Sequence, residues 1–147
     1  MIEVGPLIAT DRPRWTELWR QYLDFYETTM PDAIYEHTWQ RLLAGHELNA
    51  LAARDGGQIV GIVHFLFHPS AWTLTPVCYL QDLFTASGHR GRGTARALIT
   101  AVAEHSRAAG STRLYWLTQS DNDVARALYD KVARHTGFIR YEYPLTA

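Results

Sequence analysis

The chain has 147 residues, 47% of them hydrophobic, which is enough for one compact domain with its own core and short for two. A formal net charge of -1 argues against general nucleic-acid binding, which favours a strongly basic surface. The sequence lacks a long apolar run and an N-terminal cationic region followed by an apolar one, so it predicts neither a membrane span nor a signal peptide. We therefore expect a single cytoplasmic domain over residues 1–147 with no nucleic-acid or membrane partner; a homodimer is left open.

The first third of the chain predicts a strand followed by two helices. Residues 2–9 are apolar and read as a strand, and Thr10 or Asp11 can cap the helix that follows. Aromatic and leucine side chains then recur at helical spacing, which predicts a face turned to the core. These residues are Trp15, Leu18, Trp19, Tyr22, Leu23 and Tyr26. Pro31 interrupts the pattern before a second short helix at residues 35–43.

Acidic residues gather in the same region. Between Gln21 and Gln40 the chain has no Lys or Arg, so any face that its acids share is strongly negative. The acids are Asp24, Glu27, Asp32 and Glu36. A solvated surface and a mouth that attracts a cationic amine both explain this composition. In the second case Tyr26 and Tyr35 can add cation–π contacts, and Asp24, Tyr26 and Glu27 are the candidate substrate-binding residues.

A β-hairpin is expected next. Residues 48–54 and 58–67 are rich in strand-forming side chains, and Asp55-Gly56-Gly57 between them is typical of a tight turn. His64 and His68 alternate onto one face of the second strand, and we interpret both as structural. The single cysteine, Cys78, has apolar neighbours that suit a buried strand residue better than a nucleophile. No Cys/His cluster has zinc spacing, so no metal site is predicted.

The stretch from Tyr79 to Gly110 predicts a strand, a glycine-arginine loop and a helix that begins near Gly93 or Thr94 and ends at Gly110. Cations crowd the start of this helix, where the exposed amides already carry partial positive charge. They are Arg90, Arg92 and Arg96. Since no acid lies between Leu83 and Ala103, an anionic, phosphate-bearing ligand is expected to supply the missing charge.

Two common phosphate-binding loops do not fit this stretch. A P-loop needs Gly-Lys-Ser/Thr after four spacer residues, and the chain has no such run. The dinucleotide fingerprint needs a third small residue where Arg96 stands. What remains is R-x-x-G-x-A, spelled by residues 90–95 directly after the strand YLQDLFT. Residues 112–117, 123–134 and 138–143 then predict a strand, a helix capped by Asp121 or Asn122, and a closing strand.

These motifs resemble the GNAT superfamily of N-acetyltransferases. The loop matches the family's acetyl-CoA diphosphate loop, and residues 117–143 match its ending of strand, Asn, helix with Leu-Tyr, and Gly-Phe. Together the two matches cover about the last seventy residues. The matching positions are Asn122, Ala125, Leu128, Tyr129, Gly137 and Phe138. Residues 133–136 lengthen the link before Gly137 relative to the commoner ending. The first half of the chain matches only in outline.

The resemblance implies an α/β fold: a mixed, mostly antiparallel central sheet flanked by helices, with splayed central strands that let acetyl-CoA add like a false strand. It implies that Leu83, Phe84 and Thr85 offer main-chain groups to the pantetheine. The diphosphate would lie on the loop, and Asn122 would orient the cofactor or merely cap the helix. The loop residues are Arg90, Gly91, Arg92, Gly93, Thr94 and Ala95.

Tyr129 matches the family's proton donor, with a packing residue as the alternative. Some diamine acetyltransferases of the family have Leu-Glu-Asp where this chain has Leu80-Gln81-Asp82. Gln81 cannot accept a proton, so it stays a candidate substrate contact, and Asp82 is the candidate general base. An ordered water near Glu27 or Asp24 is the alternative base, and a structural role for Asp82 stays open.

The expected activity is transfer of the acetyl group of acetyl-CoA to a primary amine, with a small cationic amine as the partner and no metal cofactor. A protein or peptide acetyltransferase acting on lysine or an N-terminus would use the same cofactor site. A non-catalytic acyl-CoA sensor would keep the arginine loop without needing Tyr129.

Overall fold

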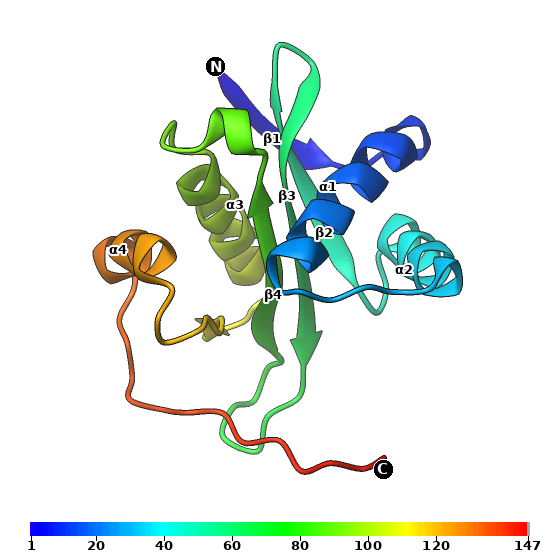
Figure 1. Cartoon of the computed structure of the whole chain (residues 1–147). Coiled ribbons are helices and arrows are strands. Elements are labelled where there is room, and N and C mark those ends of the chain that lie inside the picture. Colours follow the sequence, from blue (N-terminus) through cyan, green and yellow to red (C-terminus); the bar gives the residue numbers. More distant parts are fainter. Residues whose placement is uncertain (147) are drawn as a thin grey trace. The chain divides into compact units, whose positions relative to one another are not determined.

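The computed structural model describes residues 1–146, and the chain divides into two compact units that meet at Leu117 and Thr118. The first unit contains β1 (Ile2–Pro6), α1 (Arg12–Phe25), α2 (Asp32–Ala44), β2 (Asn49–Asp55), β3 (Gln58–His68), β4 (Val77–Thr85), α3 (Thr94–Ala108) and β5 (Leu114–Tyr115) (Figure 1). The second unit contains α4 (Asp123–Val132).

One five-stranded sheet organises the first unit, in the order β1-β2-β3-β4-β5. The first three neighbouring pairs are antiparallel, and β4 and β5 are parallel. Gly56 and Gly57 both have positive φ, 60° and 85°, as the tight turn between β2 and β3 requires. The predicted hairpin and the mixed, mostly antiparallel α/β fold are therefore confirmed.

Helices cover both faces of this sheet. In Figure 1, α3 lies on one side, and α1 and α2 lie on the other. The α1 face buries an aromatic cluster with aliphatic neighbours, as the helical spacing predicted. It includes Trp15, Leu18, Trp19, Trp39, Ile62 and Phe84. On the other face, α3 packs directly on β3 at Gly61, where an added Cβ would lie 2.8 Å from Thr94 Cγ2 and 3.2 Å from Leu98 Cδ1.

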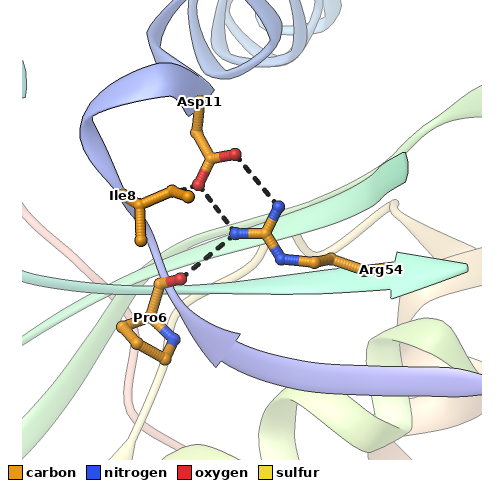
Figure 2. A network of polar contacts seen from close by, with 4 residues as sticks. All are labelled: Pro6, Ile8, Asp11 and Arg54. Carbon is orange, nitrogen blue, oxygen red and sulfur yellow. Dashed lines mark hydrogen bonds and ion pairs between the residues drawn. The ribbon is translucent and has the colours of Figure 1, made fainter. Parts of the chain in front are cut away.

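An ion pair joins β2 to the segment between β1 and α1, as Figure 2 shows. Arg54 donates to both carboxylate oxygens of Asp11, at 3.0 and 2.7 Å, and to the carbonyl of Pro6. The Ile8 amide donates to Asp11 Oδ2 at 2.8 Å. Neither Asp11 nor Thr10 therefore caps α1 through its side chain as expected, because the Asp11 carboxylate is already bonded to β2 and to Ile8.

Three strands differ from the expectation. The first ends at Pro6, because the chain turns into a short 3₁₀ helix at Ala9–Asp11. The fifth is only two residues long, since the chain leaves β4 after Tyr115. The closing strand expected at residues 138–143 is not formed; within the described part of the second unit there is no other strand with which it could pair.

Candidate active site

A bulge in β4 changes the face to which its side chains point. His64 on β3 lies opposite Asp82, but the next residue, Phe65, lies opposite Leu80, so Gln81 is an extra residue in β4. In a regular strand Leu80 and Asp82 would share a face, because side chains alternate with period two. The bulge separates them, and bulges of this kind re-aim side chains next to active sites.

The contacts of these residues identify the two faces. Phe65, opposite Leu80, has its ring 6.0 Å from that of His105 on α3. Asp82 instead contacts His64, which is bonded to Trp15 on α1. The bulge at Gln81 therefore turns the carboxylate of Asp82 toward the α1 face and leaves the Gln81 side chain exposed.

Two buried residues and one partly buried carboxylate form a hydrogen-bonded chain on the α1 face. The indole Nε1 of Trp15 donates to His64 Nε2 at 2.9 Å, and His64 Nδ1 lies 2.9 Å from Asp82 Oδ2. Trp15 is fully buried, and His64 is 2% exposed. The Asp82 side chain is 18% exposed, so a ligand can reach part of the carboxylate while the rest is held from within.

Tyr22 on α1 approaches the same carboxylate. Burial, the negative charge of Asp82 and contact with Tyr26 raise the pKa of the Tyr22 hydroxyl far above its usual range. The hydroxyl therefore stays protonated and can donate to Asp82. The Tyr22 ring lies edge-on to Tyr26 at 5.1 Å and to Phe84 at 6.2 Å. Tyr26, a candidate substrate contact, is thereby linked to Asp82 through Tyr22.

The charge of Asp82 is not balanced by a neighbouring Lys or Arg within the part of the chain that the structure describes. His64 is its only residue at ion-pair distance there. A partly buried carboxylate without a cation is costly unless hydrogen bonds or a ligand compensate it. This arrangement can hold an ammonium group and accept one of its protons.

The sequence had pointed to Asp82 but not to its partners. His64 was interpreted as structural, and Trp15 and Tyr22 were placed in the core because of their helical spacing. Their polar atoms meet Asp82 only because β3, β4 and α1 pack together and because β4 bulges. No local sequence pattern predicts the register between β3 and β4 that brings these atoms together.

The edge of β4 that faces β5 is partly open. The β5 ladder covers only Cys78 and Tyr79. From Leu80 to Thr85, β4 has β3 on one side and no strand on the other among residues 1–146. The main chain of Leu83, Phe84 and Thr85, the expected pantetheine contacts, lies on this stretch.

The glycine-arginine loop leaves the start of α3 uncapped. Gly91 and Gly93 have φ of 76° and 83°, a region that favours glycine, and the space beside both is open. Gly93 is the N-cap of α3, and no side chain caps the helix and no acid lies in its first turn. The buried hydroxyl of Thr94 lacks a hydrogen-bond partner among the described residues. Free amides and an unsatisfied hydroxyl fit a phosphate group.

The arginines of this loop are placed differently from one another. Arg90 Nε donates to the carbonyl of Thr85 at 3.3 Å, and its guanidinium lies 5.7 Å from the centre of the Phe84 ring. Arg90 therefore connects the loop to the open end of β4. Arg92 and Arg96 are exposed, and Ala95 is half-buried in the first turn.

One acid of the acidic stretch is paired with an arginine that precedes the stretch. Glu36 pairs with Arg12 and accepts from Gln40 at 2.7 Å, and these bonds lower the pKa of its carboxyl, Gln40 contributing most. Glu27 is exposed and has a left-handed backbone, with φ of 54°. The sequence did not anticipate the pairing, because Arg12 lies twenty-four residues before Glu36.

Asp24 and Asp32 line a hollow of about 190 Å³ between α1 and α2. Arg20 also lines it, and its guanidinium lies 5.4 Å from the centre of the Tyr35 ring. Tyr35 is buried, and the cation that contacts its ring is Arg20 of the protein itself rather than a cationic substrate. The hollow is mixed in charge rather than wholly negative.

The second unit contains the remaining expected site residues. Asn122 caps α4, its Oδ1 accepting from the Ala125 amide at 3.3 Å, so its capping role is confirmed. Tyr129 lies on α4, seven residues after this cap.

Other chemistry is limited in the described residues. Cys78 is buried, which raises the pKa of its thiol and disfavours the reactive thiolate. No cluster of three or more His, Cys, Asp or Glu side chains within residues 1–146 is arranged to hold a metal ion. Over the same residues, no helix has the length and apolar character needed to cross a membrane.

Comparison with known proteins identifies relatives over almost the whole chain. Residues 13–133 match the model of the acetyltransferase (GNAT) family. A D-amino-acid N-acetyltransferase of Saccharomyces cerevisiae is 32% identical over 144 residues, covering 96% of this chain and 89% of the relative.

Solved structures share the fold. A ribosomal-protein-alanine N-acetyltransferase from Brucella melitensis biovar Abortus 2308 is 24% identical with a TM-score of 0.80, covering 99% of this chain and 100% of its own. An enzyme named AAC(6')-Iy, in complex with the bisubstrate analogue CoA-S-monomethyl-acetylneamine, is 18% identical with a TM-score of 0.86 and covers 99% of both chains.

Proposed function

The chain belongs to the GNAT family of acetyltransferases, and we propose that it transfers the acetyl group of acetyl-CoA to the primary amine of a small cationic molecule. The relative from yeast is named for D-amino acids, and the AAC(6')-Iy complex contains an analogue that joins CoA to an acetylated neamine. Both names support a small amine as the acceptor class.

The observation that carries this proposal is the environment of Asp82. Its carboxylate is partly exposed, is approached by Tyr22 from α1 and by His64 from β3, and has no Lys or Arg partner within residues 1–146. An ammonium group is the ligand that balances such a charge. An amine attacks a thioester only through its free lone pair, so a group that holds the ammonium and takes up one proton serves both binding and catalysis.

In the proposed reaction, Asp82 accepts one proton from the bound ammonium, which frees the nitrogen lone pair to form its bond to the acetyl carbon as the C–S bond breaks. The carboxylate becomes neutral, and the nitrogen releases a second proton as it becomes an amide, which balances the proton that the thiolate takes up. Tyr129 is the proposed donor of a proton to the departing thiolate. Gln81, exposed at the bulge beside Asp82, is proposed to contact the acceptor, together with Asp24, Tyr26 and Glu27.

Acetyl-CoA supplies the activated acetyl group. The residues proposed to hold its diphosphate are those of the uncapped helix start: Arg90, Gly91, Arg92, Gly93, Thr94 and Ala95. The proposed pantetheine contacts are the main chains of Leu83, Phe84 and Thr85, on the stretch of β4 without a β5 neighbour. Asn122 is proposed to orient the cofactor in addition to capping α4.

The test is an acceptor screen. Acetyl-CoA is incubated with cationic diamines, aminoglycosides, D-amino acids, neutral amines and basic peptides, and free thiol and acetylated product are measured. We expect product with small amines and the highest kcat/KM with cationic ones. Thiol release that does not depend on an acceptor, or product with basic peptides alone, would contradict the proposal.

A further inference from the structure

The hydrogen bond between Trp15 and His64 has a consequence for Asp82. An indole N–H can only donate, so His64 Nε2, 2.9 Å from Trp15 Nε1, must be an acceptor without a proton. The neutral ring then carries its proton on Nδ1, which donates to Asp82 Oδ2 at 2.9 Å. One tautomer satisfies both bonds.

Protonation of His64 would break this arrangement. A second proton on Nε2 would face the indole N–H of Trp15 in a site where His64 is 2% exposed and Trp15 is 0% exposed. Trp15 has little room to turn away, because its ring packs on Trp19 at 5.3 Å and on Trp39 at 5.1 Å. An imidazolium would therefore leave two buried donors facing each other, at a cost of a lost hydrogen bond and more.

The bonds to Trp15 and Asp82 are the interactions that determine the charge state of His64. Among the titratable groups of the elements packed against His64, Asp82 on β4 bonds to its ring, and Tyr22 on α1 approaches the Asp82 carboxylate. Tyr35 on α2 contacts the rings of Trp15 and Trp19, which lie beside His64. Tyr22 stays neutral beside Asp82. The guanidinium of Arg20 on α1 lies over the Tyr35 ring, 5.4 Å from its centre.

We propose that Trp15 is a positioning residue that locks His64 in its neutral Nδ1–H tautomer, so that Asp82 keeps an unbalanced negative charge for the acceptor amine. A protonated His64 would form an internal ion pair with Asp82 and compete with the ammonium of the acceptor. The catalytic part of this inference rests on the proposed function, whereas the tautomer of His64 does not.

The tautomer is measured without any substrate. Long-range ¹H–¹⁵N correlation spectra of the ¹⁵N-labelled wild type, with the His64 signals assigned by their loss in His64→Gln, are recorded from pH 5.5 to 8. We expect the Nδ1–H pattern of a neutral imidazole. An Nε2–H pattern, or the pattern of a doubly protonated ring, would overturn the proposal.

The functional consequence is measured with two tryptophan variants. Trp15→Phe removes the donor to His64. Trp19→Phe is the matched control, because Trp19 lies on the same helix, its ring is 5.8 Å from that of His64, and its buried Nε1 bonds to none of the described residues. The kcat/KM of each variant is divided by that of the wild type at every pH, which cancels the ionisation of the acceptor itself.

Without the lock, a histidine beside a carboxylate can take up a second proton as the pH falls, because the carboxylate stabilises the imidazolium. The ratio for Trp15→Phe should therefore fall about tenfold between pH 8 and pH 5.5, while the ratio for Trp19→Phe stays flat. A flat ratio for Trp15→Phe would show that its role is packing alone. If Trp15→Phe does not fold, the wild-type spectra decide; if the wild type acetylates no amine, the proposed function fails and the spectra still test the tautomer.

Discussion

Asp82 illustrates at the scale of single residues how a charge can be kept in a largely buried position. A hydrogen bond to a charged group contributes about 1.5–3 kcal/mol, and His64 and Tyr22 approach the same carboxylate. Such bonds offset part of the cost of burial without cancelling the charge, which a Lys or Arg would do. The remaining imbalance is what a cationic acceptor would satisfy.

Asp11 is the opposite case, because its carboxylate is paired with a cation, Arg54, within the fold. The bonds from Arg54, its largest influence, hold the pKa of Asp11 below its usual range. Its contribution to stability is therefore present above the unfolded-state pKa of about 3.9 and is lost as the pH falls through the lower folded-state pKa. We expect Asp11→Asn to lower the free energy of unfolding by about 1–3 kcal/mol at pH 7, and this difference to shrink below about pH 4.

Urea unfolding at pH 7 and at pH 3 measures this difference. Asp55→Asn is the matched control, since the Asp55 carboxylate meets only the exposed N-terminal amine among the ion pairs of the described chain, at 3.4 Å. Exposed pairs contribute about 0–1 kcal/mol. Equal effects of the two substitutions at pH 7 would contradict the importance of the Asp11–Arg54 pair.

For Tyr129, the expectation is a moderate effect. A thiol with a pKa of about 8.5 can depart as its thiolate near neutral pH without being protonated first. A proton donor therefore accelerates the departure of CoA only in part. Tyr129→Phe should keep CoA affinity and fold and lower kcat by about tenfold to a thousandfold. Wild-type turnover, with the chemical step shown to be rate-limiting, would make Tyr129 a packing residue.

The start of α3 is the element on which cofactor binding depends in the proposal. Arg90→Glu combined with Gly93→Asp should weaken CoA binding more than about a hundredfold in calorimetry, because charge-assisted bonds of about 1.5–3 kcal/mol each are lost and replaced by repulsion. Asp adopts a left-handed backbone at some cost in strain, but the space beside Gly93 is open and the loop is exposed, so the fold should survive. Arg107→Glu, near the other end of α3, is the control and should leave CoA affinity unchanged. Unchanged affinity in the double variant would contradict the assignment.

The contact between α3 and β3 has its own test. Gly61→Ala places a methyl group 2.8 Å from Thr94 Cγ2, so α3 must shift, at a cost of about 1–3 kcal/mol in stability. Gly5→Ala is the control, because the space beside Gly5 in β1 is open. Thermal unfolding that shows equal midpoints for the two variants would contradict this tight packing.

The elements also show what the sequence could predict. Helical periodicity predicted α1, α2 and α3, and Asp55-Gly56-Gly57 predicted the hairpin, since each signal is local. The extra residue at Gln81 was not predicted, because a bulge depends on the register between two strands. The side of the sheet to which Asp82 points, and hence its meeting with His64, followed from that register.

In the first unit as a whole, the two faces of the sheet differ in the kind of interaction that they bury. The α3 face carries close apolar packing and leads into the glycine-arginine loop, whereas the α1 face carries the buried polar chain from Trp15 to Asp82. β4 serves both, because its bulge moves side chains from one face to the other. This explains why the loop and the C-terminal motifs pointed to the family but not to the neighbours of the carboxylate.

The most direct measurement is the kcat/KM of Asp82→Asn for a cationic primary amine, compared with the wild type and with Asp55→Asn, which changes the net charge equally at the β2–β3 turn. With Asp82 as proton acceptor and ammonium ligand, kcat/KM should fall about a hundredfold to ten-thousandfold, with CoA affinity preserved and Asp55→Asn close to wild type. A kcat/KM of Asp82→Asn within about twofold of the wild type would show that another group binds and deprotonates the amine.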